Sequence, residues 1–182
     1  MAGNIRLGKI AGLEFSAGLS ALIGAIILWI VFGIIGSVIF RATVTEAIIG
    51  GFLATLLHWI GELLHQLGHA FFAWRTGHPM IGIRFWGFLS SSLYPANEPP
   101  LPASVHIKRA LGGPRVSLWI SVVALLVAMV MFKQDNTYWW VAALFFLDDL
   151  FIFTLGSFVP LGFTDGSTLL RYWKHRKDPT PM

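Results

Sequence analysis

A stripe of ionisable side chains on an otherwise apolar segment is the feature that most constrains this chain. Residues 58–69 read HWIGELLHQLGH, with apolar residues on both sides. Four polar residues share one face of a helix with this sequence: His58, Glu62, His65 and His69. Ionisable groups are costly in lipid, so they must face a bundle interior or a water-filled cavity. The stripe is therefore the candidate functional site, and Gln66 stands beside it.

The composition indicates a membrane protein. Of the 182 residues, 55% are hydrophobic and only 12% are charged, and the mean hydropathy is +0.70. Soluble domains carry about 25% charged residues. The chain has no cysteine, which excludes disulfides, cysteine-bound zinc and thiol nucleophiles. Any metal must therefore be bound by histidine and carboxylate.

We expect a single membrane-embedded domain over residues 1–182, an all-α polytopic fold with four transmembrane helices. The expected spans are residues 16–40, 47–74, 115–132 and 138–173. The first has no charge from Phe15 to Phe40, which is too long for a signal peptide. The last is too long for one straight crossing, so we predict a break near residues 156–165, where Pro160 removes a backbone donor and Gly162 permits unusual dihedrals.

Between the second and third spans we predict a short membrane-associated β-hairpin within Met80–Tyr94. The segment is rich in β-branched and aromatic residues and has Gly87 at its centre. The carboxylates of Asp148 and Asp149 are expected at the outer interface if the last span begins at Leu150. If that span begins earlier they are buried, and pairing with His58 becomes possible.

The basic residues predict the orientation. With the N-terminus inside, the expected spans leave only Arg41 and Lys133 on the outer side. The positive-inside rule then places both termini in the cytoplasm of a multi-pass protein, for which we expect the cell membrane. The net charge of +4 reflects this bias toward anionic lipid, so we expect the bilayer and no nucleic acid as a partner.

The same topology brings two distant segments to one depth. His69 lies six residues before Arg75, and Asp165 lies six before Arg171, so both sit roughly 9 Å from the inner boundary if helical. Two histidines one turn apart and a carboxylate from another segment make the three-ligand set of a catalytic zinc, with a fourth position for water. The residues alone therefore favour a metal site.

The chain resembles the site-2 protease (peptidase M50) family of intramembrane zinc metalloproteases, as a minimal core without PDZ or CBS domains. The HQLGH segment, residues 65–69, resembles the family's HExGH segment. The LGGP segment, residues 111–114, resembles its GP segment, and residues 158–166 resemble its N-x-x-P…DG motif. The motif positions are Gly113, Pro114, Ser117, Ser157, Pro160 and Gly166.

The resemblance implies an activity and a role for each matching residue. It implies an intramembrane zinc metalloprotease that cleaves transmembrane helices of membrane proteins. The implied ligands of one Zn²⁺ per chain are His65, His69 and Asp165. The implied substrate-binding hairpin contains Ile81, Ile83, Phe85 and Gly87. Position 66 is that of the glutamate general base.

Two departures from the family pattern qualify this reading. Gln66 replaces the base, and an amide cannot take a proton near neutral pH, so we expect this sequence to be inactive or impaired. Two explanations stay open: a substitution made to trap an inactive enzyme, and a homologue that has lost or weakened its hydrolysis. Ser117 and Ser157 stand where many members have asparagine. We assign Glu62 and His58 supporting roles beside the metal-bound imidazoles.

Two other functions remain open. One is a non-catalytic zinc-binding protein that retains transmembrane partners. The other is an ion or proton pathway lined by His58, Glu62, His65 and Asp149.

Overall fold

The computed structural model describes residues 4–134 and 136–181. Four helices in these ranges are long and apolar enough to cross a membrane, which confirms the predicted number of spans. They are α1 (Leu19–Val38), α2 (Val44–Arg75), α3 with α4 (Ala103–Ala110 and Gly112–Lys133), and α5 with its continuation (Trp139–Phe158). Many large apolar side chains on α1 and α4 are exposed, as expected for surfaces that face lipid.

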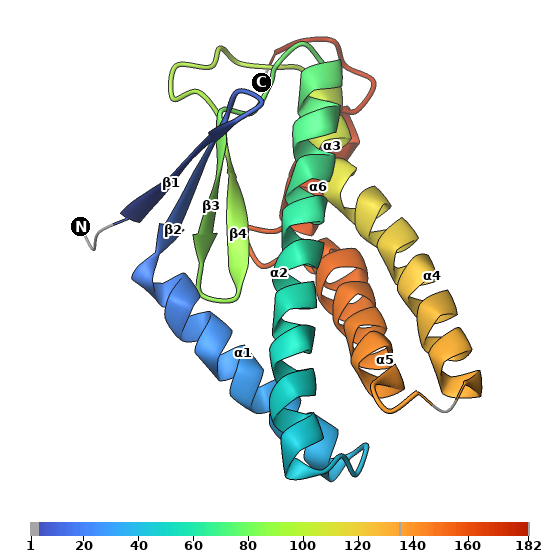
Figure 1. Cartoon of the computed structure of the whole chain (residues 1–182). Coiled ribbons are helices and arrows are strands. Elements are labelled where there is room, and N and C mark those ends of the chain that lie inside the picture. Colours follow the sequence, from blue (N-terminus) through green and yellow to red (C-terminus); the bar gives the residue numbers. More distant parts are fainter. Residues whose placement is uncertain (1–3, 135, 182) are drawn as a thin grey trace.

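Helix α2 is the longest element and the central support of the fold (Figure 1). It begins at a capping box, in which the Thr43 hydroxyl accepts from the Glu46 amide and the Glu46 carboxylate accepts from the Thr43 amide. It ends at Arg75, and Gly77, two residues later, has a positive φ of 77° that turns the chain away. In Figure 1 the sheet lies on one side of α2, and α4 and α5 lie on the other.

The sheet has four strands, where the sequence predicted one isolated hairpin. Strands β1 (Asn4–Ile10) and β2 (Leu13–Gly18) precede α1, and β3 (Gly82–Trp86) and β4 (Leu89–Leu93) follow α2. The order is β1-β2-β3-β4, with β2 parallel to β3 and the other pairs antiparallel. All strands therefore precede α3. The hairpin predicted within Met80–Tyr94 is present as β3 and β4. The expectations of an all-α fold and of β structure only between the second and third spans are wrong, because β1 and β2 precede α1. Strand β4 is left as an edge.

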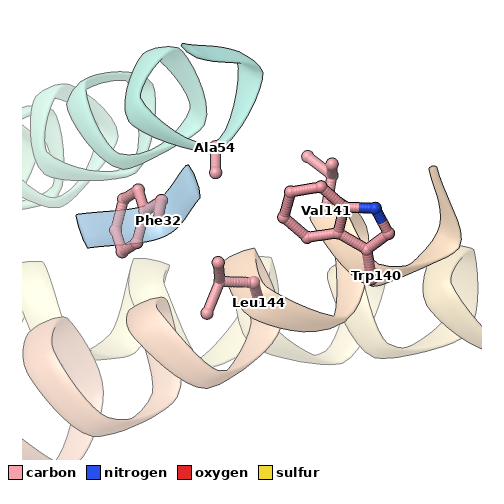
Figure 2. Close-up of a cluster of buried hydrophobic side chains, with 5 residues drawn as sticks. All are labelled: Phe32, Ala54, Trp140, Val141 and Leu144. Atoms are coloured by element: carbon pink, nitrogen blue, oxygen red, sulfur yellow. The ribbon is translucent and has the colours of Figure 1, made fainter. Parts of the chain in front are cut away.

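The main apolar cluster lies at the end of the bundle away from the sheet. Figure 2 shows its buried side chains, which come from α1, α2 and α5: Phe32, Ala54, Trp140, Val141 and Leu144. The Trp140 ring lies against Gly36 of α1 and Gly50 of α2, where an added Cβ would overlap it. This packing fixes α5 against α2 and so positions the segment that follows α5.

The last span changes geometry as it approaches the site. After α5 (Trp139–Asp148) the chain continues as the π-helical η1 (Asp149–Leu155) and the short η2 (Gly156–Phe158). It then leaves helical geometry and resumes as α6 (Asp165–Tyr172), followed by η3 (Trp173–His175). π-Helical turns are rare and often lie at functional sites.

The structure overturns the expected interfacial position of Asp148 and Asp149. Both lie inside the span that begins at Trp139, and Asp149 is fully buried. Asp149 accepts a hydrogen bond of 2.6 Å from Ser121 of α4. The interfacial position required a span that begins at Leu150, but the span begins at Trp139 and so contains both carboxylates.

Candidate metal centre

Three side chains from two distant segments converge beside the C-terminal half of α2. His65 and His69 come from α2, and Asp165 is the first residue of α6. One ligand atom from each lies within 4.8 Å of the others. The two Nε2 atoms are 3.0 Å apart, and the Asp165 oxygens lie 3.6 Å from that of His65 and 3.5 Å from that of His69. The structure thus brings together the three residues that the sequence nominated.

The surroundings of His69 fix which of its nitrogens carries a proton. Its Nδ1 lies 2.8 Å from the backbone oxygen of Arg109, which can only accept, so Nδ1 donates. The Gly113 amide is also near this nitrogen, but at 3.3 Å it is the longer contact. The Nε2 atom of neutral His69 is therefore a free lone pair aimed at His65. On the other ring, His65 Nδ1 lies 3.0 Å from the Ser117 hydroxyl.

The donor set fits a zinc ion. Two imidazole nitrogens that face each other at 3.0 Å in a buried site need a shared cation or proton between them. Tetrahedral zinc with bonds of about 2.0–2.1 Å sets its ligand atoms about 3.3 Å apart. The three separations here bracket that value. Each histidine is also held through its Nδ1, as metal-ligating histidines usually are.

A compact turn delivers Asp165 to the histidines. The Thr164 hydroxyl bonds the backbone oxygen of Val159 at 2.5 Å, and the Gly162 amide donates to Ser167 at 2.7 Å. Gly162 has a φ of +92°, which a residue with a side chain adopts poorly. Side-chain bonds across residues 159–167 therefore close the break and set Asp165 at the start of α6.

Close backbone approach of α2 and α4 shapes the opposite wall. A Cβ added to Gly68 would lie 2.6 Å from the Gly112 oxygen, and the reverse holds for Gly112 and Gly68. This contact carries Gly113 directly under the two histidines, where a Cβ would overlap both Nε2 atoms. The GGP segment thus leaves the space in which a metal would sit.

Gly113→Ala is expected to weaken zinc binding without removing a ligand. The added methyl group overlaps both Nε2 atoms, so the rings or α4 must shift, and we expect affinity to fall roughly 10–100-fold, as when outer supports of metal sites are lost. Competition with a chelator measures this. Val123→Ala on the exposed face of α4 is the control, and an unchanged affinity in Gly113→Ala would contradict the geometry.

The three side chains open onto a cavity of about 630 Å³. Its walls come from α2, β4, α3, η1 and the residue 159–165 segment. Apolar residues line one part, including Phe151, Phe153 and Leu161, while Ser90 and Ser92 of β4 border another. The volume is that of a typical ligand pocket, and the edge strand β4 runs along it.

Arg109 supports the metal centre from outside it. Its guanidinium is buried, pairs with Glu98 at 2.5 and 2.9 Å, donates to the His78 oxygen and lies 4.2 Å over the Tyr94 ring. The bonds from Arg109 hold the pKa of Glu98 below its usual range, and burial raises the pKa of Tyr94 to about 12. At neutral pH this wall therefore carries a charged pair and a protonated phenol.

The other stripe residues separate into different environments. Gln66 is buried, and its side-chain oxygen accepts a bond of 2.7 Å from the Ser92 hydroxyl. Glu62 lines the cavity together with the histidines. His58 lies away from the cavity, bonded to the Asp148 carboxylate at 2.9 Å and to the Phe88 oxygen at 2.8 Å.

The predicted hairpin residues occupy an inner strand. Ile83 is fully buried, and β3 is paired on both sides, with β2 and with β4. Gly87 forms the turn between β3 and β4, and its amide donates to Ser20 of α1 at 3.2 Å. Ile81 and Phe85 flank Ile83 on the same segment. The free edge beside the cavity is therefore β4, one strand beyond the residues proposed from sequence.

The motif residues of the last two spans surround the metal centre. Pro114 and Ser117 lie in the first turns of α4, and Ser157 borders the cavity. Pro160 lies in the break, and Gly166 packs against the Phe158 backbone, where a Cβ would overlap it.

Three supporting residues were missed by sequence reasoning: Ser90, Ser92 and Arg109. The two serines alternate along one face of a short strand, a pattern that would have indicated a polar contact. Arg109 contacts His69 through its backbone oxygen. A pattern of side chains in the sequence cannot predict such a contact.

The arrangement is that of a multi-pass membrane protein with a His-His-Asp cluster whose two histidines are buried. The structure is similar to the solved structure of the site-2 protease from Methanocaldococcus jannaschii, with a TM-score of 0.63 and 20% sequence identity. The match covers 97% of this chain and 74% of that one. No protein-family model and no curated protein matches the sequence. At this identity the likeness establishes the fold.

Proposed function

We propose that this protein is an intramembrane zinc metalloprotease of site-2 protease type. The observation that carries the proposal is the convergence of His65, His69 and Asp165 at the wall of a large cavity within a bundle of candidate membrane spans. These three residues would hold one Zn²⁺. A zinc ion in that place polarises a peptide carbonyl and makes water a better nucleophile.

The chain's own residues account for the rest of the site. Ser117 and the Arg109 oxygen hold the two imidazoles in orientation through their Nδ1 atoms. Gly113 leaves the space between them, and the residue 159–167 turn holds Asp165 opposite. The apolar part of the cavity suits a segment drawn from a membrane-spanning helix.

The proposed substrate is the transmembrane helix of another membrane protein, unwound where it is cut. An extended peptide needs backbone partners, and an edge strand supplies them. Strand β4 is such an edge and borders the cavity. We therefore place substrate pairing on β4, with Ile81, Ile83 and Phe85 supporting it from behind.

The proposed setting is the cell membrane, with both termini in the cytoplasm. The exposed apolar faces of α1 and α4 support contact with the bilayer. The bias of basic residues to one side supports the orientation. Nucleic acid is not a proposed partner, and neither is any soluble protein.

Cleavage of a transmembrane test substrate in zinc-loaded proteoliposomes tests the proposal. We expect fragments cut within the membrane segment, at a rate that Gln66 limits and Gln66→Glu raises. We expect none from Asp165→Asn, which removes the charged ligand. Chelation should stop the reaction, and added zinc should restore it.

Other outcomes would assign the alternatives. Bound zinc without cleavage, in both the natural sequence and Gln66→Glu, would indicate a binding protein. Metal-independent proton or ion flux would indicate a pathway along the polar stripe.

A further inference from the structure

Glu62 is a carboxylate in the cavity that the proposed function has not used. It is 2% exposed and lines the same cavity as His65, His69 and Asp165. It lies three residues before His65 on α2, so the two side chains start on one face, with Cβ atoms roughly 5–6 Å apart. A buried carboxylate in a catalytic cavity is a candidate for proton transfer.

Strand β4 holds Glu62 by one oxygen. Its Oε1 accepts from the Ser90 amide at 2.5 Å and also from the Ser90 hydroxyl. Among residues 4–134 and 136–181, Oε2 makes no hydrogen bond to protein, and it is not among the buried polar atoms that lack a partner. One oxygen is thus fixed by the strand edge, while the other remains open to water in the cavity.

Gln66 lies one turn further along α2 and contacts the same strand. Its side-chain oxygen accepts from Ser92, the next residue along the same face of β4, and Gln66 is not among the residues that line the cavity. Helix α2 and β4 are therefore joined by two polar pairs, Glu62 with Ser90 and Gln66 with Ser92. Both members of the first pair line the cavity, whereas only Ser92 of the second pair does, and only the first pair contains a carboxylate.

Glu62 lines the cavity beside the potential metal ligands without being one of them. The cluster of potential ligands with atoms within 4.8 Å of one another contains the two histidines and Asp165, and Glu62 lies outside it. The general base of a hydrolase needs this relation, because it must reach the attacking water without occupying the metal.

We infer that Glu62 is the general base of the proposed protease and takes the place of the missing carboxylate at position 66. As the water oxygen bonds to the scissile carbonyl carbon, one water proton passes to Glu62. That proton then passes to the amide nitrogen as the carbon–nitrogen bond breaks, which leaves one amine end and one carboxylic acid end, and the acid then releases its remaining proton to solvent. The inference rests on the proposed function and goes beyond it by naming the proton acceptor.

Glu62→Gln tests the role, because glutamine keeps an oxygen that accepts from Ser90 and cannot take the proton. We expect cleavage to fall about 10²–10⁴-fold, the usual contribution of a general base. Zinc content, thermal unfolding and exchange protection of the Ser90 amide should stay as in the natural sequence. Glu46→Gln, on the same helix and in a capping position that accepts glutamine, is the matched control and should cleave normally.

A binding measurement gives a readout that does not depend on turnover. A peptide hydroxamic acid bound to the zinc-loaded protein can give its proton to a neighbouring carboxylate. Because bonds to a charged partner are the stronger ones, we expect Glu62→Gln to weaken this affinity roughly tenfold or more. Glu46→Gln should leave the affinity unchanged.

The outcomes separate this inference from the proposed function. Cleavage by the natural sequence that survives in Glu62→Gln, or unchanged hydroxamate affinity, overturns the role of Glu62 and leaves the protease intact. Cleavage that occurs only after Gln66→Glu likewise overturns the role of Glu62 and leaves the proposed protease function intact. Absence of cleavage in both the natural sequence and Gln66→Glu, with zinc bound, overturns the protease and the inference with it.

Discussion

His69→Ala is expected to reduce bound zinc from about one ion per chain to background. The substitution removes one of three convergent ligands. The remaining pair, His65 and Asp165, lies 3.6 Å apart, and no other donor of the described residues 4–134 and 136–181 completes a set of three. We expect affinity to fall by more than about 100-fold, because loss of outer supports alone costs 10–100-fold. Metal analysis of purified protein after dialysis against a weak chelator measures it.

The control is His175→Ala. His175 is exposed near the C-terminus, in η3, so its removal should leave the zinc content unchanged. Thermal unfolding in detergent should be recorded for both variants, since loss of metal by global unfolding would appear in both zinc content and secondary structure. Full zinc occupancy in a folded His69→Ala protein would contradict zinc binding by His65, His69 and Asp165.

The metal cluster was predictable from the sequence because two simple geometries define it. His65 and His69 are one helical turn apart, a relation that sequence spacing gives directly. Asp165 followed from its depth relative to the basic residues that end each span. Both arguments depend on regular helices crossing a slab of known thickness, and membrane proteins obey that constraint closely.

The sheet was not predictable in the same way. Its central pairing joins β2 to β3 across the whole of α1 and α2, and strand pairing depends on such tertiary neighbours more than on local preference. From the sequence, the segment around Arg6 and Lys9 was therefore interpreted as a charged flank of the first span, whereas it forms β1. The contacts of Glu62 and Gln66 with β4 were hidden for the same reason.

The contact with β4 changes the interpretation of Gln66. From the sequence it was only a missing base, and Glu62 only a supporting group. In the structure both bind serines of one strand face, and the carboxylate is the member of the pair that borders the cavity. The general base expected to be missing at position 66 and the general base proposed at position 62 thus belong to the same contact between α2 and β4.

Breaking the His58–Asp148 pair is expected to cause the largest loss of stability. The Phe88 oxygen can only accept, so His58 Nε2 donates to it, and Nδ1 shares a proton with Asp148. Both side chains are buried, at 3% and 10% exposure. His58→Leu leaves the carboxylate without its partner, and removal of one member of a buried pair costs about 3–5 kcal/mol. We expect the low end, about 3 kcal/mol, because the unfolded chain in a bilayer finds other partners.

A double substitution separates the pair from the packing around it. Replacing both members by leucine removes both buried charges, and such replacements are often neutral. His58→Leu with Asp148→Leu should therefore be more stable than His58→Leu alone, short of full recovery because the Phe88 oxygen still lacks a donor, at about 1–3 kcal/mol. Denaturant unfolding in detergent measures the three proteins, and an additive double substitution would show that the two residues do not interact.

The same variants test whether this pair acts on the site at a distance. Phe88 lies two residues before Ser90, so the His58 bond fixes the end of the strand that holds Glu62. Loss of that bond should let the Ser90 amide exchange faster in the folded protein, while zinc, held by residues that do not contact His58, stays bound. Faster exchange of the Ser90 amide with unchanged zinc content is the result expected if His58 supports the hairpin. An ion pathway through His58 does not predict this result.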